Sequence, residues 1–313
     1  MQTILGASGT IGTNLAKSLK DYTQDIRVVS RNPRKVNVTD TLLAADLTKR
    51  AEVDTAVAGS EIVYLTVGFE YQTAVWRAVW PPLMRDVVDA CEKHRAKLVF
   101  FDNVYAYGPE SIPHMTEESP IAPISEKGKI RAEVVRTLLT AVKKGRIPAL
   151  IARSADFYGP NTGGKSVLMQ TVFENLRHKK AAMWLGKVDK KHSFTFTPDA
   201  ARGTALLGNT PDAFNQTWHL PTDGDALTAR QWVELFAREL NAQAKVRAMP
   251  AWMVRALGLF VPLMRELGEM LYQYDRDYVF DSSKFTKRFS MKPTSPVEGV
   301  RAVIADSAAR PGS

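Results

Sequence analysis

The chain begins with a short apolar run that leads directly into a glycine-rich turn. Gly6, Gly9 and Gly12 lie between an expected strand at residues 3–5 and an expected helix at residues 11–19. Glycines allow a sharp turn and let a ligand phosphate approach the backbone closely. The helix N-terminus adds free amide N–H groups and the positive end of a dipole. This strand–turn–helix context predicts a dinucleotide-binding Rossmann fold in which the turn holds a pyrophosphate.

The first half of the chain alternates β-rich runs with segments of helical period. We expect strands at residues 3–5, 26–29, 62–66, 97–101 and 149–153, and helices at residues 11–19, 53–57, 81–93 and 125–144. Such alternation is typical of an α/β fold with a doubly wound parallel sheet. After residue 160 the alternation weakens and prolines separate shorter elements. We therefore predict a Rossmann domain at residues 1–160 and a smaller C-terminal substrate lobe at 161–313, from which some segments return to the sheet.

Composition narrows the class of protein. With 313 residues and 45% hydrophobic content, the chain can build a large core. A single cysteine, Cys91, and the lack of a leader before the first motif lead us to expect a cytoplasmic protein. The net charge of +9 is spread over short basic groups without a helix-turn-helix, zinc-ligand or RNA-stacking signature, so we expect neither a nucleic-acid partner nor a metal site.

The only long apolar stretch, residues 250–274, is interrupted by charged residues and a proline. These interruptions argue against a membrane span, and we expect no membrane partner. The stretch suits a helical face that covers a pocket, forms a dimer contact or, as the least favoured option, touches a membrane surface.

The end of the second expected strand bears on the choice of cofactor. An NAD-preferring protein usually places an acidic residue there, against the adenosine ribose hydroxyls. This chain instead has Arg31, with Arg34 and Lys35 close behind. Such cations suit a 2′-phosphate through charge-assisted hydrogen bonds. The residues favour NADP over NAD, and the competing interpretation is a basic surface loop.

Further motifs follow the glycine turn in a fixed order along nearly the whole chain. They are Ala45-Asp46-Leu47, Tyr64-Leu65-Thr66-Val67-Gly68, the segment from Pro120 to Glu133, Phe157-Tyr158-Gly159-Pro160, Thr197-Pro198-Asp199-Ala200-Ala201 and Phe280-Asp281-Ser282-Ser283-Lys284. In this order they resemble the extended short-chain dehydrogenases/reductases, the NAD-dependent epimerase/dehydratase family. The resemblance implies an NAD(P)-binding oxidoreductase. The cofactor contacts expected are Gly6, Ser8, Gly9, Thr10, Ile11, Gly12, Asp46, Leu47, Thr66, Val67, Lys129, Ser154 and Ala155.

The resemblance also implies a catalytic Tyr-x-x-x-Lys pair on one helix, and here the chain departs from the family. Aligned on the lysine, the chain reads Ser125-Glu126-Lys127-Gly128-Lys129. Lys129 then stands at the lysine position and Ser125 at the tyrosine position. The family's catalytic Ser or Thr position falls on Asn103. A spacing of four places both side chains on one helix face, where an ammonium lowers the pKa of a phenol, but a serine hydroxyl is a poor acid beside a phenol.

Two replacements for the missing phenol remain open. Tyr105 or Tyr107, which follow a central strand, present a phenol near Lys129. Alternatively, Ser125 relays a proton through water to Asp102 or to the neighbouring glutamate. The competing interpretations are that the tyrosines pack a strand–loop corner, that Ser125 caps the helix and that Lys129 is a solvated helix lysine.

Two further positions bear on the substrate. Where sugar-nucleotide members of the family hold a diphosphate with Asn and Arg, this chain has Asp156 and His192. A carboxylate repels phosphate, so we expect Asp156, His192 and Tyr107 to contact a substrate that is not a nucleotide. As alternatives, Asp156 pairs with Arg153 or Lys165, and His192 lies on the surface.

These residues predict an NAD(P)-dependent oxidoreductase that acts on a small carbonyl or hydroxyl compound. One alternative is a sugar-nucleotide epimerase or dehydratase with tightly bound NAD. Another is a regulatory protein that binds NADP without catalysis. The resemblance also implies a homodimer formed through the two long helices.

Overall fold

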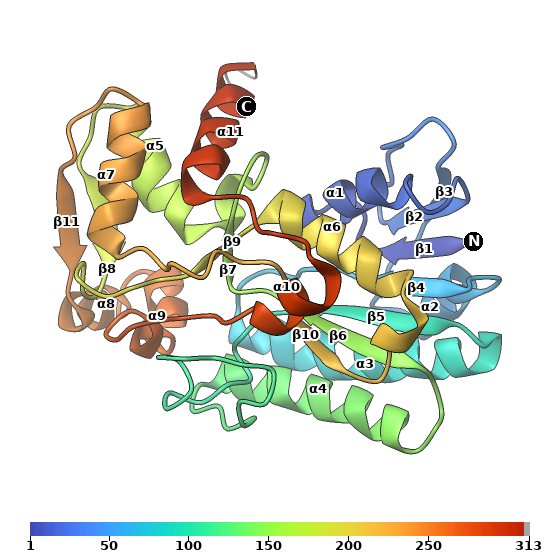
Figure 1. Cartoon of the computed structure of the whole chain (residues 1–313). Coiled ribbons are helices and arrows are strands. Elements are labelled where there is room, and N and C mark those ends of the chain that lie inside the picture. The colour runs from blue at the N-terminus through green and yellow to red at the C-terminus, as the bar shows by residue number, and fades with distance from the viewer. Residues whose placement is uncertain (310–313) are drawn as a thin grey trace. The chain divides into compact units, whose positions relative to one another are not determined.

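The structure is a computed structural model that describes residues 1–309 (Figure 1). The chain divides into two compact units, which consist of residues 1–106, 121–154 and 200–220 in the first and of residues 107–120, 155–199 and the chain from 221 onward in the second. The sequence placed one boundary at residue 160. In the structure, residues 107–120 and 155–160 belong to the second unit, and residues 200–220 return to the first.

The first unit is built on one parallel seven-stranded sheet. The strand order is β10-β6-β5-β4-β1-β2-β3. The strands are β1 (Gln2–Leu5), β2 (Ile26–Ser30), β3 (Thr41–Ala44), β4 (Ile62–Leu65), β5 (Lys97–Asp102), β6 (Ala149–Arg153) and β10 (Thr217–His219). Every neighbouring pair runs parallel, which confirms the doubly wound α/β prediction. The sequence missed β3, which is a largely exposed edge strand, and β10, which has only three residues.

Helices cover both faces of this sheet (Figure 1). They are α1 (Thr10–Leu19), α2 (Arg50–Val57), α3 (Thr73–His94), α4 (Glu126–Lys143), α6 (Thr197–Gly208) and the short η3 (Pro211–Ala213). α1 and α6 lie on one face, and α2, α3 and α4 pack side by side on the other. Central strands β1 and β4 are buried along their whole length, as expected for parallel strands covered on both sides.

The start of α3 was wrongly predicted. From its helical period, the helix was expected at residues 81–93. The helix instead begins at Thr73 and carries Pro81 and Pro82 inside it. Trp76 and Trp80 are buried in the core of the first unit, and this burial outweighs the backbone hydrogen bonds that the prolines remove.

The second unit has two small parallel sheets, β7 (Asp156–Tyr158) with β9 (Phe194–Phe196) and β8 (Ala182–Leu185) with β11 (Val246–Met249). Its helices are η1 (Gly163–Lys165), η2 (Met169–Phe173), α5 (Glu174–Arg177), α7 (Ala229–Glu239), α8 (Ala251–Leu257), α9 (Pro262–Gly268), η4 (Leu271–Gln273), α10 (Ser283–Phe289) and α11 (Pro296–Ala309). The core of this unit is rich in aromatic residues and includes Tyr158, Trp184, Phe194, Trp232 and Phe236.

The apolar stretch at residues 250–274 forms α8, α9 and η4. Within residues 1–309, no helix is both long enough and apolar enough to cross a membrane.

Candidate active site

The glycine turn follows β1 at the carboxyl edge of the sheet. Gly6 has a φ of +98°, a left-handed conformation that side chains rarely adopt. A Cβ atom on Gly6 would lie 2.5 Å from the Cα atom of Val67, which follows β4. A Cβ atom on Gly12 would lie 2.6 Å from the carbonyl oxygen of Gly6. Both positions therefore need glycine because the backbones of the turn, of α1 and of the chain after β4 pack against one another.

The first turn of α1 suits an anionic ligand. Its N-cap is Gly9, so no side chain caps the helix, and the first turn carries no acidic residue. A Cβ atom on Gly9 would approach only the Gly6 carbonyl oxygen, at 3.4 Å, so one side of this residue is open. Uncapped amides and the helix dipole attract phosphate. The residues present thus fit the linking phosphates of a dinucleotide.

The other expected cofactor residues around this edge have local roles in the fold. The Ser8 hydroxyl donates to Ser30 Oγ over 2.7 Å, which ties the glycine turn to the end of β2. The Thr66 hydroxyl donates to the Leu5 carbonyl over 3.2 Å. Hydrogen bonds from Thr48 lower the pKa of the Asp46 carboxyl.

Several more of the expected cofactor residues lie where the fold buries them. Thr10 and Ile11 are in the buried part of the first turn of α1, and Leu47 is 6% exposed. Ser154, at the end of β6, donates its backbone N–H to the Asp102 carbonyl. Ala155 donates its backbone N–H to Thr195 Oγ1 in the second unit.

Arg31 follows β2 and is exposed. Within residues 1–309 its guanidinium has no hydrogen bond or ion pair. It lies close enough to Asp46 to contribute, as the smallest of several causes, to the lowered pKa of that carboxyl. An exposed guanidinium without a protein partner is available to an anionic ligand.

Lys129 lies on the exposed side of α4. Its ammonium donates to Glu126 over 2.7 Å, and Arg77 of α3 pairs with the same carboxylate over 2.6 Å. Both interactions lower the pKa of the Glu126 carboxyl, and the hydrogen bond from Lys129 contributes most. Lys129 also lines an exposed groove of about 720 Å³ between α3 and α4, together with Arg85 and other charged residues. Within residues 1–309, Glu126 is its polar partner, and the expected approach to Tyr105 is not seen.

Ser125 is the N-cap of α4. Its Oγ accepts a hydrogen bond from the backbone N–H of Gly128 over 3.1 Å. This confirms the capping interpretation that the sequence left open. The side chain is buried and engaged in the first turn of the helix.

A different lysine of α4 is buried. Lys127 is fully enclosed, and its ammonium donates to Thr73 Oγ1 over 2.9 Å. The same ammonium lies 4.6 Å from the ring centre of Tyr71. The Tyr71 hydroxyl lies 3.3 Å from that of Tyr105, and the Tyr105 ring stacks on Trp76. The structure therefore groups one ammonium with two phenols, and the sequence had singled out only Tyr105 among these.

Gly128 explains how this group forms. A Cβ atom at Gly128 would lie 2.5 Å from the carbonyl oxygen of Tyr105 and 2.7 Å from Pro123. Only a glycine lets the chain after β5 approach the first turn of α4 this closely. The Asn103 side chain shapes the same segment, because its Oδ1 accepts the backbone N–H of Tyr105 over 3.0 Å.

Asp102, at the end of β5, is engaged on both of its carboxylate oxygens. Oδ1 accepts from Arg131 of α4, and Oδ2 accepts from Arg153 of β6 over 2.9 Å and 3.1 Å. Burial by itself raises the pKa of Asp102, but the two guanidiniums outweigh it and hold the pKa below its ordinary value. This arrangement does not support the proton relay from Ser125 that the sequence left open.

Tyr107 is fully buried in the second unit, and its hydroxyl donates to the Thr116 carbonyl over 2.9 Å. This placement favours the packing interpretation over contact with a substrate. The two tyrosines that the sequence offered as alternatives thus differ: Tyr107 is buried, whereas Tyr105 is partly exposed.

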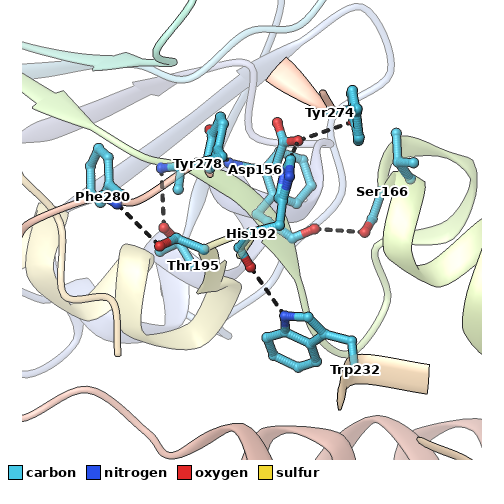
Figure 2. Close-up of polar contacts among 12 residues, drawn as sticks. Asp156, Ser166, His192, Thr195, Trp232, Tyr274, Tyr278 and Phe280 are labelled. Atoms are coloured by element: carbon cyan, nitrogen blue, oxygen red, sulfur yellow. Dashed lines mark hydrogen bonds and ion pairs between the residues drawn. The ribbon is translucent and has the colours of Figure 1, made fainter. Parts of the chain in front are cut away.

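In the second unit, the structure brings Asp156 and His192 together (Figure 2). His192 Nε2 lies 3.0 Å from Asp156 Oδ2, which also accepts from the Tyr274 hydroxyl over 3.2 Å. Tyr278 stacks on the imidazole with ring centres 4.2 Å apart, and its hydroxyl accepts the Asp156 backbone N–H. Trp232 donates to the His192 carbonyl over 3.1 Å.

This geometry corrects two sequence interpretations. His192 is only 2% exposed, so it is not a surface histidine. Asp156 pairs with neither Arg153 nor Lys165, because Arg153 is held by Asp102 and the Asp156 carboxylate is held by His192 and Tyr274.

One carboxylate oxygen of Asp156 remains available. The side chain is 20% exposed. Within residues 1–309 no group donates to Oδ1. A carboxylate that is held in place through one oxygen can use the other to accept a hydrogen bond from a ligand hydroxyl or ammonium.

Comparison with known proteins agrees with this architecture. Residues 3–220 match the model of the NAD dependent epimerase/dehydratase family. A curated dTDP-6-deoxy-L-talose 4-dehydrogenase (NAD(P)(+)) from Kitasatospora kifunensis is 29% identical over 164 residues, and the match spans 50% of each chain. The chain thus covers about half the length of this relative.

Solved structures share the fold at low sequence identity. A dTDP-glucose 4,6-dehydratase from Streptomyces venezuelae, with NAD and TYD bound, has a TM-score of 0.80 at 15% identity, covering 100% of this chain and 98% of that one. A UDP-glucose 4-epimerase from Thermus thermophilus in complex with NAD has a TM-score of 0.78 at 15% identity, covering 99% and 100%. With the glycine turn, the parallel sheet and a family match over residues 3–220 in agreement, the chain belongs to the NAD dependent epimerase/dehydratase family.

Proposed function

We propose that the protein is an NAD(P)-dependent oxidoreductase that acts on a small carbonyl or hydroxyl compound without a nucleotide diphosphate. The observation that carries this proposal is the Asp156–His192 pair, which presents a carboxylate oxygen where the resemblance would place an amide against a diphosphate. A carboxylate repels phosphate and accepts hydrogen bonds from hydroxyl groups. The family match and the uncapped N-terminus of α1 support cofactor binding.

The cofactor, when bound, supplies the hydride chemistry. Side chains of the protein then donate the proton and replace it. In the reducing direction the Tyr105 hydroxyl gives its proton to the carbonyl oxygen of the substrate, and the Tyr71 hydroxyl, 3.3 Å away, restores it. Tyr71, which is partly exposed, then takes up a proton from solvent. The Lys127 ammonium, 4.6 Å from the Tyr71 ring centre, stabilises the negative charge that develops on the phenols. Lys127 thereby takes the catalytic role that we expected of Lys129, but not the contact with the cofactor.

Arg31 supports NADP as the preferred cofactor. Its guanidinium follows β2, is exposed and has no partner within residues 1–309. A 2′-phosphate placed near it gains charge-assisted hydrogen bonds, whereas the ribose hydroxyls of NAD find no carboxylate at this position. The 2′-phosphate therefore contributes net affinity.

Fluorescence titration with NADPH and NADH tests the cofactor assignment. We expect Arg31→Ala to weaken NADPH binding about tenfold and NADH binding less than about twofold. Lys17→Ala, an exposed lysine at the far end of α1, is the matched control and should change neither. Gly9→Asp should abolish both, because the added carboxylate can cap α1 but repels phosphate. Failure of the wild type to bind either dinucleotide refutes the proposal.

Absorbance at the nicotinamide band against a panel of small carbonyl and hydroxyl compounds tests the chemistry. Turnover of a compound without a nucleotide supports the proposal. Tight cofactor binding without redox change across the panel supports the regulatory alternative.

A sugar-nucleotide dehydrogenase or epimerase is the second candidate, and the names of the relatives favour it. The same titration with dTDP and UDP separates the two. Micromolar binding of either nucleotide supports the second candidate, and its absence beside turnover of a small carbonyl supports the first.

A further inference from the structure

The densest group of exposed apolar side chains belongs to a helical hairpin of the second unit, which comprises α8, α9 and the turn between them (residues 251–268). Of twelve exposed large hydrophobic residues within residues 1–309, six lie in it: Trp252, Leu257, Leu259, Phe260, Val261 and Leu263. Leu259 and Phe260, in the turn, are 80% and 85% exposed. Single exposed apolar residues are ordinary, but a contiguous group marks a binding surface.

The hairpin is held to its own unit by its other face. Val254 is fully buried, and Ala251, Met264 and Leu267 pack against the core of the second unit. The two helices also meet closely, since a Cβ atom on Gly258 would lie 3.0 Å from the Cα atom of Arg265. The apolar residues of the turn are therefore exposed on an anchored element.

The backbone N–H groups of the turn are paired within the hairpin. The N–H groups of Leu259, Phe260 and Val261 donate to carbonyls of α8 over 3.2, 3.0 and 2.8 Å. An unsatisfied amide is costly in an apolar medium, and this cost excludes most loops from lipid. In this turn the amides are already paired, so the turn can leave water without losing hydrogen bonds of its N–H groups.

The charges that flank the turn are basic. Residues 241–265 include Lys245, Arg247, Arg255 and Arg265 and no acidic residue, and the first glutamate after them is at position 266. Arg255 and Arg265 are exposed, and within residues 1–309 neither has a hydrogen bond or ion pair. Unpaired guanidiniums beside an exposed apolar tip complement lipid phosphates.

We propose that the hairpin at residues 251–268 docks on the surface of a bilayer that contains anionic lipids. Leu259 and Phe260 enter the boundary of the acyl chains, Trp252 lies at the level of the headgroups, and the two arginines meet phosphates. Contact with a second copy is less favourable, because a two-fold interface brings the same unpaired cations together. The sequence had ranked a membrane surface last for this segment, and the exposure of the turn changes that order.

Co-sedimentation of the 313-residue chain with vesicles tests this proposal. The probes are vesicles of phosphatidylcholine alone and of phosphatidylcholine with about one quarter phosphatidylglycerol. We expect binding to the anionic vesicles that is at least about tenfold tighter and weakens as salt is added. The tryptophan emission should shift to the blue on binding, and Trp252→Phe should remove most of that shift.

Two variants and a matched control complete the test. Leu259→Asp with Phe260→Asp should lower vesicle binding at least about tenfold, and Arg255→Gln with Arg265→Gln should remove the preference for anionic lipid. Val38→Asp adds an acidic residue at a position that is 88% exposed outside the hairpin, and should change nothing. No vesicle binding by the folded wild type overturns the proposal. So does concentration-dependent dimerisation that the turn variant abolishes while vesicles remain unbound.

Discussion

Two carboxylates, one in each unit, illustrate different uses of an acidic side chain that its neighbours hold in place. Asp102 of the first unit has both oxygens engaged by Arg131 and Arg153 and is fully enclosed. Asp156 of the second unit has one oxygen held by His192 and Tyr274 and is 20% exposed. A fully satisfied buried charge stabilises one arrangement of the fold, whereas a held carboxylate with a remaining oxygen can meet a ligand. The comparison indicates a structural role for Asp102 and supports the binding role that we propose for Asp156.

The largest effect should come from breaking the first of these sites. Asp102→Asn removes the carboxylate that pairs with both Arg131 and Arg153, so two cations stay buried together. We expect a loss of about 3–5 kcal/mol in the free energy of unfolding, measured by denaturant titration. Asp156→Asn is the matched control and should cost less than about 1 kcal/mol, because an amide oxygen still accepts from His192. Equal losses in the free energy of unfolding in the two variants would contradict the different roles of Asp102 and Asp156.

The Asp102→Asn variant should also differ from the wild type in acid. The pKa of Asp102 is lower in the folded protein than its ordinary value. Its ionised form therefore stabilises the fold above the pKa of the unfolded state, and this contribution is lost as the pH falls through the folded value. Asp102→Asn should flatten the acid limb of the stability curve, measured by denaturant titration as a function of pH.

The two lysines of α4 extend the comparison to catalysis. Lys127→Met should lower kcat about 100-fold because the phenols lose their neighbouring cation. Lys129→Met removes an exposed ammonium that pairs with Glu126 and should change kcat less than about twofold. NADPH affinity should be unchanged in both variants, and thermal melting checks that they fold. A larger loss of kcat in Lys129→Met than in Lys127→Met would instead identify Lys129 as the catalytic lysine.

Much of the first unit could be predicted because its signals are local. The glycine turn and the apolar runs of β1, β4 and β5 dictate the parallel sheet. Lys127 was also accessible in principle. Ile130, Val134 and Leu138 define the buried face of α4, and residue 127 precedes them at helical spacing, whereas Lys129 falls off that face.

The rest depends on contacts between distant segments. Asp156 and His192 are 36 residues apart and meet because β7 pairs with β9. Tyr71 and Tyr105 are 34 residues apart and meet after β4 and β5 pair. Single-sequence patterns report periodicity and turns, and they carry no information on which distant side chains pack together.

A smaller effect sharpens the contrast at Asp156 itself. Because Oδ1 is the oxygen left for a ligand, Asp156→Asn should raise the KM for a small hydroxyl or carbonyl substrate about tenfold and leave kcat within about threefold. His192→Gln tests whether the hydrogen bond from the imidazole positions the Asp156 carboxylate. Without the imidazole the carboxylate can rotate, and we expect a rise in KM that is smaller than that of Asp156→Asn. Steady-state kinetics measures both. A fall in stability without a change in KM would make Asp156 as structural as Asp102.

The smallest expected effect uses a buried group in the first unit that has no compensating cation. Burial alone raises the pKa of the Cys91 thiol to about 12, in contrast to Asp102, where two guanidiniums oppose burial. Because the unfolded thiol ionises first, stability falls as the pH rises above its unfolded pKa, by about 1 kcal/mol between about pH 9 and 10. Cys91→Ala should remove this loss of stability. The part of the pH dependence that comes from buried tyrosines should remain. If the two slopes coincide, burial does not govern ionisation in this core, and the same reasoning at Asp102 loses its support.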